Sequence, residues 1–137
     1  MGFDLANTRA AVGETTVGPG TVADLAPVWE VDGVKGVTGT PVVAGGTVYV
    51  GDWTGHLRAI DAGTGDEAWR FAVTAGDATE GPGVSVWSSP AVDIDRGVLY
   101  IGTGQAYALP APPRSDALLA LDLRTGREVW STQFTAG

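Results

Sequence analysis

The feature that most constrains the fold is a unit of short strand-like segments that occurs twice. Residues 40–72 hold four such segments, and the turns between them are rich in glycine. Two of the segments, 57–61 and 67–71, alternate apolar and polar residues, which places one face of a strand in a core. Glycine tolerates the positive φ that tight hairpin turns require. We therefore predict a four-stranded antiparallel meander over these residues.

The unit returns in the second half of the chain. Thr40-Pro41-Val42-Val43 and Glu67-Ala68-Trp69 have counterparts at Ser89-Pro90-Ala91-Val92 and Glu128-Val129-Trp130. A shorter piece, Val28-Trp29-Glu30-Val31, matches only the last segment of the unit. Trp29, Trp69 and Trp130, which occupy the same place in the unit, lie 40 and then 61 residues apart. Units of about 40 residues with four strands each are typical of the blades of a β-propeller.

We therefore predict an all-β fold, a partial β-propeller of two four-stranded antiparallel blades plus a remnant of a preceding blade. A blade packs both faces on its neighbours, and a closed ring needs roughly four to eight blades. Two blades leave apolar faces open, so we interpret the chain as a piece of a larger propeller. A ring assembled from several copies, and a truncated reading frame without independent function, are the alternatives. The predicted divisions are 1–39 (extended segment and last strand of a preceding blade), 40–73 (first full blade), 74–84 (connection) and 85–137 (second full blade).

Composition and charge exclude several function classes. The net charge is −8 and the pI about 4.3, which argues against a nucleic-acid partner or a basic membrane surface. There is no cysteine, so neither disulfides nor thiolate metal sites form. No apolar run approaches the roughly 18 residues of a membrane span, and the N-terminus lacks the pattern of a signal peptide. Residues 21–25 predict a helical turn with Thr21 as its cap and Asp24 three places on.

The place of a residue in the unit predicts its role. The tryptophans at 29, 69 and 130 are expected to stack on a neighbouring blade, each with its indole N–H on a backbone acceptor. The aspartate before each Thr-Gly pair is expected to accept backbone hydrogen bonds in its turn. Trp53 is expected to serve packing or partner contact at a loop tip. His56, the one histidine, is expected to be a solvated turn residue.

Three stretches of the sequence carry a resemblance to a known family. The pattern AxDxxTGxxxW occurs at 59–69 and 120–130. It resembles the tryptophan-docking repeat of the quinoprotein alcohol dehydrogenases, propeller enzymes that use pyrroloquinoline quinone (PQQ). The N-terminal residues resemble the start of the mature chain in those enzymes (2–4, 7–9, 22–25 and Trp29). The most specific stretch resembles the polyvinyl-alcohol dehydrogenase branch (86–93, 99–104, Tyr107, Pro110 and 115–117).

The resemblance implies a function in alcohol oxidation with PQQ as the cofactor. Trp87 is then expected to lie flat against PQQ, with Thr103, Gly104 and Gln105 in the turn beside it. Gln105 stands where the family has an oxygen ligand for Ca²⁺, a metal that prefers hard oxygen donors. The family's catalytic aspartate would lie beyond this chain, so no catalytic residue is assigned within it. The resemblance also implies that a blade between the two units, which supplies a glutamate ligand, is missing; Glu80 in the connection is a candidate substitute.

Further expectations follow from the same resemblance. The partners are an alcohol substrate and the remaining blades of the propeller, and the location is periplasmic or secreted. The alternative is a non-catalytic scaffold for protein binding, like the outer-membrane assembly lipoproteins built from the same repeat. Trp87 and the Gly-Thr-Gly turn favour the dehydrogenase, whereas Gln105 and the missing ligands favour the scaffold.

Overall fold

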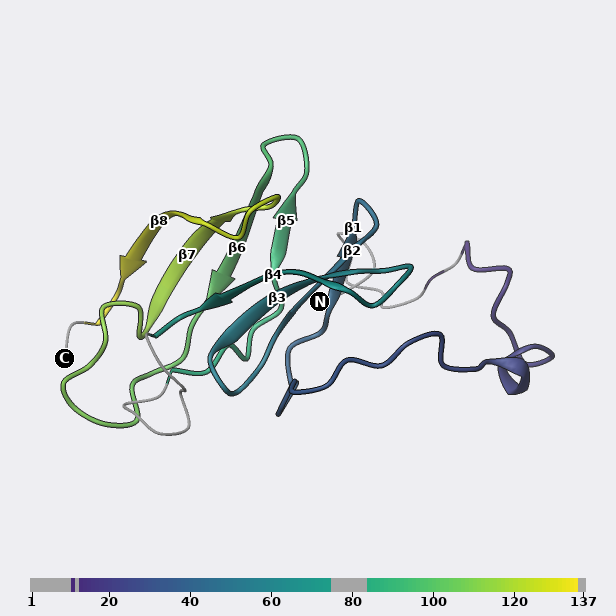
Figure 1. Cartoon of the computed structure of the whole chain (residues 1–137), viewed down its shortest axis with the longest axis horizontal. Helices are drawn as coiled ribbons and strands as arrows, with labels where there is room; N and C mark the ends of the chain where they lie inside the picture. The colour runs from purple at the N-terminus through teal and green to yellow at the C-terminus, as the bar shows by residue number, and fades with distance from the viewer. Residues whose placement is uncertain (1–10, 12, 75–83, 136–137) are drawn as a thin grey trace. The chain divides into compact units, whose positions relative to one another are not determined.

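The computed structural model describes residues 11, 13–74 and 84–135, and it holds two four-stranded antiparallel sheets. Figure 1 shows the sheets side by side, with β1 of one lying against β5 of the other. They are the predicted blades and are called blade 1 and blade 2 below. Blade 1 contains β1 (Val42–Ala44), β2 (Thr47–Gly51), β3 (His56–Asp61) and β4 (Glu67–Ala72). Blade 2 contains β5 (Ala91–Asp93), β6 (Val98–Gly102), β7 (Ala117–Asp122) and β8 (Glu128–Gln133).

The two blades share their strand register as well as their strand order. In blade 1, Tyr49 pairs with Ala59 and Ala59 with Trp69 across neighbouring strands. In blade 2 the same line runs from Tyr100 through Ala120 to Trp130. The tyrosine and tryptophan rings lie 6.0 Å apart in both blades, and the third strand shows an irregularity directly after its alanine in both. The sequence repeat is therefore a structural repeat.

The core of the molecule lies between the blades. Blade 1 contributes Tyr49, Leu57 and Ala59 to one buried cluster, and blade 2 contributes four large side chains, Leu99, Ile101, Leu119 and Leu121. These four are between 0 and 1% exposed, so they are sealed by the contact with blade 1. Burial of large aliphatic side chains stabilises a fold by roughly 1.5–3 kcal/mol each. The packing of one blade on the next is thus the main source of stability in this part of the chain.

Trp69 adds a directed contact to that apolar interface. Its indole N–H donates to the carbonyl oxygen of Leu123 at 2.9 Å, in the β7–β8 turn of blade 2. The ring lies so close to Gly126 that a Cβ there would be 2.6 Å from ring carbons. Gly126 also has a φ of 67°, a conformation that side-chain-bearing residues rarely adopt. The backbone acceptor predicted for this tryptophan is therefore on the neighbouring blade.

The aspartates of the two repeat turns behave as predicted. The Asp61 carboxylate accepts backbone N–H bonds from Gly63 at 2.8 Å and Thr64 at 2.9 Å. The Asp122 carboxylate accepts the backbone N–H of Thr125 at 2.8 Å and its hydroxyl at 2.7 Å. The bonds from Thr64 and Gly63 lower the pKa of Asp61, and the hydroxyl and N–H of Thr125 lower that of Asp122.

We expect these turns to make folding sensitive to acid. A carboxyl group whose pKa is lowered in the folded state contributes stability above its ordinary pKa, here 3.8, and loses it as the pH falls through the lowered value. The double variant Asp61→Asn/Asp122→Asn keeps an oxygen acceptor but no longer titrates. Its urea midpoint should therefore fall less between pH 5 and pH 3 than that of the wild type. An equal fall in both proteins would assign the acid sensitivity to other groups.

Outside the blades, two expectations are corrected. Residues Val28–Val31 form no strand, because a fourth strand needs a third strand to pair with, and none is present beside it in the described part of the chain. The predicted helical turn exists as the 3₁₀ segment η1 (Val22–Asp24), but Thr21 does not cap it. The Thr21 hydroxyl instead donates to the carbonyl oxygen of Thr16 at 2.8 Å.

The chain divides into two units, Met1–Glu30 and Val31–Gly137, and both blades belong to the second. Over the described residues, no helix has the length and apolar character that crossing a membrane requires. The predicted counterparts of the family's N-terminal residues at 2–4 and 7–9 lie outside the described residues, as does Glu80.

Candidate functional site

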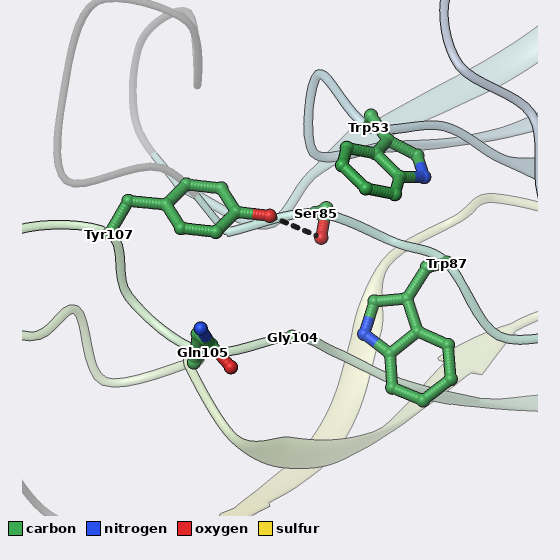
Figure 2. Close-up of a pocket in the computed structure, with 6 residues that line it drawn as sticks. All are labelled: Trp53, Ser85, Trp87, Gly104, Gln105 and Tyr107. Atoms are coloured by element: carbon green, nitrogen blue, oxygen red, sulfur yellow. Dashed lines mark hydrogen bonds between the residues drawn. The ribbon is translucent and has the colours of Figure 1, made fainter.

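A pocket of about 350 Å³ opens where the ends of the two blades meet. It lies beyond the last residues of β2 and β6 and beside the segment that leads into β5. This volume is within the range of small-molecule sites in proteins. Six residues from both blades line it: Trp53, Ser85, Trp87, Gly104, Gln105 and Tyr107 (Figure 2).

Three large aromatic side chains surround the pocket and remain half exposed. The exposed fractions are 52% for Trp53, 55% for Trp87 and 56% for Tyr107. Trp69 and Trp130 each lie against a tyrosine, whereas neither pocket tryptophan stacks on another aromatic ring of the described residues. Apolar surface that gathers around one hollow and is left open to water is typical of a binding site.

Trp87 is held by its neighbours in the chain and by a glycine of the opposite turn. Val86 is fully buried, and its N–H donates to the carbonyl oxygen of Asp52 at 2.8 Å. A Cβ at Gly104 would lie 3.1 Å from the indole nitrogen of Trp87 and 2.9 Å from the hydroxyl oxygen of Ser85. Because Gly104 has no side chain, the Trp87 indole can pack directly against the backbone of that turn. The indole N–H itself has no hydrogen-bond partner among the described residues, so it is available to a ligand.

Of the four site residues predicted from the sequence, the structure brings three to the pocket. Trp87, Gly104 and Gln105 line it, and the Gln105 side chain is exposed there. Thr103 lies behind them and is 8% exposed. Its hydroxyl donates to the carbonyl oxygen of Arg114 at 2.6 Å and accepts the N–H of Ala117 at 3.0 Å. Thr103 thus shapes the turn that presents the other two and does not face the pocket.

Trp53, Ser85 and Tyr107 are pocket residues that the sequence did not single out as a group. The Ser85 and Tyr107 hydroxyls share a hydrogen bond of 3.0 Å across the pocket (Figure 2). Trp53 was expected to serve packing or partner contact, but it lines the pocket. One signal was available, because Trp53 follows β2 at the position where Gly104 follows β6. A residue at that position pairs with the segment that leads into the first strand of its own blade, Lys35 for Trp53 and Ser85 for Gly104.

Behind Trp53 lies a buried ionic cluster. Asp52 is fully buried and Arg58 is 4% exposed, with 3.6 Å between the Asp52 Oδ2 and Arg58 Nε atoms. Arg58 also donates to Glu67 at 2.6 Å and to the carbonyl oxygen of Gly33 at 3.0 Å. Burial raises the pKa of Glu67, but hydrogen bonds and charge from Arg70 and Arg58 outweigh that effect and keep it lowered.

The expectation of a solvated His56 is wrong. The residue begins β3, and its side chain is only 18% exposed. The ring Nδ1 lies 2.9 Å from the Thr54 hydroxyl, and the backbone N–H of His56 donates to the Asp52 carboxylate at 3.1 Å. The preceding turn residues, Thr54 and Gly55, suggested an exposed position. The hydrogen bond to the buried Asp52 carboxylate instead holds the start of β3 in the interior.

The lining of the pocket fits the implied cofactor PQQ in part. The aromatic faces, the free indole N–H and the amide of Gln105 fit one side of a planar ring with oxygen substituents, such as PQQ. None of the six lining residues is charged, so the cations that PQQ's carboxylates require would come from elsewhere. Within the described residues there is no group of three or more histidine, cysteine, aspartate or glutamate side chains that could hold a metal. Gln105 alone is not a calcium site.

Comparison with known proteins places these features in a family. The family model PQQ_2, described as outer membrane protein assembly factor BamB, matches residues 7–137. The chain belongs to this family. The match covers both blades and the whole pocket, so the predicted repeat and its family are confirmed.

Several alcohol dehydrogenases are similar to this chain. Quinohemoprotein alcohol dehydrogenase ADH-IIG of Pseudomonas putida is 30% identical over 74% of the chain and 19% of its own length. A polyvinylalcohol dehydrogenase of a Pseudomonas species is 33% identical over 59% of the chain and 15% of its own length. The solved structure of ADHIIG from P. putida HK5 superimposes with a TM-score of 0.62 at 29% identity, over 72% of this chain and 20% of that one. The chain therefore spans a fifth or less of the length of these relatives, and its two sheets are propeller blades of their kind.

Proposed function

We propose that this PQQ_2 chain forms part of a propeller that oxidises an alcohol, and that it supplies one wall of the PQQ site. The observation that carries the proposal is Trp87, a half-exposed indole with an unstacked face and an unused N–H at the pocket between two blades. Trp69, a structural tryptophan of the same repeat, has neither property, because its N–H donates to Leu123 and its face lies on Gly126. Similarity to quinohemoprotein and polyvinylalcohol dehydrogenases supports the choice of ligand.

Each residue of the wall has a distinct role in this proposal. The Trp87 ring would support the plane of PQQ. Gln105 would offer its amide N–H to PQQ or its amide oxygen to Ca²⁺. The other calcium ligands would come from blades outside this chain. Thr103 and Gly104 keep the turn narrow enough for the indole to lie on it. PQQ, when bound, is the group that accepts the electrons of the alcohol.

Direct binding of PQQ tests the proposal. We expect equilibrium dialysis and tryptophan fluorescence, corrected for PQQ absorbance, to report saturable binding to the wild-type chain. Trp87→Ala should weaken binding about tenfold, since the ring contact contributes roughly 0.5–1.5 kcal/mol beyond the apolar area that it buries. Each titration is run with and without Ca²⁺, and the ion should tighten binding only if Gln105 takes part.

The matched control is Trp130→Phe, which alters an exposed tryptophan of blade 2 away from the pocket. It should bind PQQ as the wild type does. An identical response of wild type and Trp87→Ala would remove the role proposed for the indole. A wild-type chain that binds no PQQ at all would remove the cofactor itself from the proposal.

The second candidate function is a scaffold that binds other proteins. It is favoured by the description of the matching family and by the lack of an acidic metal cluster in the described residues. In that case the pocket takes no quinone. The absence of PQQ binding in the titration above would therefore favour the scaffold. Under either function we propose a periplasmic or secreted location.

A further inference from the structure

We propose that Trp53 is a second indole contact for the ligand, so that the planar ring is held by one tryptophan from each blade. The inference rests on the proposed function and adds a residue that determines how tightly the ring is held. It starts from the lining of the pocket, to which blade 1 contributes Trp53 and the second half of the chain contributes the rest.

Trp53 and Gly104 occupy the same position in the repeat but have opposite sizes. The Trp53 N–H donates to the carbonyl oxygen of Lys35 at 3.0 Å, and the Gly104 N–H donates to that of Ser85 at 2.9 Å. Each pocket indole in turn lies on a glycine. A Cβ at Gly36 would be 2.9 Å from Trp53, and one at Gly104 would be 3.1 Å from Trp87. A glycine in each blade thus leaves room for one indole. In blade 1 the indole belongs to the loop after β2, and in blade 2 it belongs to the segment before β5.

The Trp53 ring is fixed at one edge and open on its face. Its indole N–H donates to the Thr38 hydroxyl at 2.9 Å, which sets the orientation of the ring. Even so, 52% of the residue remains exposed, and no aromatic ring of the described residues covers it. A side chain that served only to pack would bury its face instead. A fixed and uncovered aromatic face is suited to stacking on a planar ligand.

Asp52 couples the two indoles through the backbone. It directly precedes Trp53, and its carbonyl oxygen accepts the N–H of Val86, which directly precedes Trp87. Its buried carboxylate also accepts the Thr54 hydroxyl at 2.6 Å, so the loop that carries Trp53 is anchored on both sides of that residue. The two tryptophans therefore have a defined spacing before any ligand binds, so that ordering them costs little conformational entropy on binding.

The uncharged lining defines the class of ligand. Trp53 and Trp87 offer two aromatic faces, and the polar atoms beside them belong to Ser85, Gln105 and Tyr107. Such a lining suits a flat conjugated ring with carbonyl oxygens on its edge better than a charged sugar or phosphate. The quinone portion of PQQ has this character, with its charged groups left to the rest of the propeller.

The test measures PQQ binding to Trp53→Ala and Trp53→Phe by equilibrium dialysis, beside the wild type, Trp87→Ala and Trp130→Phe. We expect Trp53→Ala to weaken binding about tenfold and Trp53→Phe to weaken it less, because a smaller ring still stacks. Thr38→Val should give an intermediate loss, since the ring is kept but its anchor is removed. PQQ should also raise the urea midpoint of the wild type more than that of Trp53→Ala.

Two results overturn the inference, and they differ in what they say about the cofactor. If Trp87→Ala weakens binding while both Trp53 variants bind as the wild type does, Trp53 is not a contact, although the proposed function stands. If the wild type binds no PQQ, both proposals fall together. Circular dichroism of each variant shows whether it is folded, and Trp53→Phe keeps the test decisive if the alanine variant is not.

Discussion

Trp69→Ala should lower the free energy of unfolding by about 3–5 kcal/mol, whereas Trp130→Ala should lower it by about 1 kcal/mol. The two residues occupy the same position in the repeat and pair with a tyrosine at the same distance. Trp69 also donates to Leu123 and lies against Gly126 of the next blade. Trp130 is 42% exposed and, within the described residues, has no further blade to meet. The difference between the two losses therefore isolates what blade docking contributes.

The measurement is urea unfolding of each variant, followed by circular dichroism so that the lost fluorophore does not matter. Trp69→Phe keeps an aromatic ring but has no N–H for Leu123, and it should fall between wild type and Trp69→Ala. Equal losses for Trp69→Ala and Trp130→Ala would mean that the contact within a blade, and not between blades, dominates.

Arg58→Leu alone should lower the free energy of unfolding by about 3 kcal/mol, and adding Asp52→Thr should restore most of it. Removing Arg58 leaves the fully buried Asp52 carboxylate without its cation, a change that typically costs 3–5 kcal/mol. The buried pair is also imperfect, since Asp52 Oδ2 and Arg58 Nε make no hydrogen bond. An apolar replacement of the whole pair is therefore expected to be nearly neutral.

Blade 2 shows how the replacement would be accommodated. It carries Thr103 and Leu119 at the positions of Asp52 and Arg58. The Thr103 hydroxyl accepts the N–H of Ala117, just as the Asp52 carboxylate accepts the N–H of His56. Glu67 keeps its ion pair with Arg70 at 2.9 Å in the double variant. A double variant as unstable as Arg58→Leu would show that the ionic cluster stabilises blade 1 in a way that blade 2 does not reproduce.

The blades could be predicted from the sequence because their signals are local. Alternation over 57–61 and 67–71 depends only on neighbouring residues, and an aspartate before Thr-Gly makes the same turn wherever it occurs. Trp69 could be assigned to the interface because a repeat of this kind stacks on itself. What failed was Val28–Val31, where the pattern of a strand was present but its pairing partner was not.

The pocket could be predicted only in part because its residues meet through long-range contacts. Trp87 was found because it stands outside the repeat's tryptophan positions and resembles a family motif. Trp53 and Tyr107 are separated by more than fifty residues and come together only when the two blades pack. Nothing in the local sequence reports that the Ser85 hydroxyl would meet Tyr107, or that buried Asp52 would draw His56 inward.

The bond from Trp69 to the carbonyl of Leu123 has a consequence for the chain as it is made. The acceptor, and the glycine on which the indole lies, are synthesised more than fifty residues after the tryptophan. At about 5–20 residues per second, the ribosome needs roughly 3–11 s to cover that interval. During this time the nascent first sheet carries an uncovered apolar side, and a chaperone that shields such surfaces would have its greatest effect in that window.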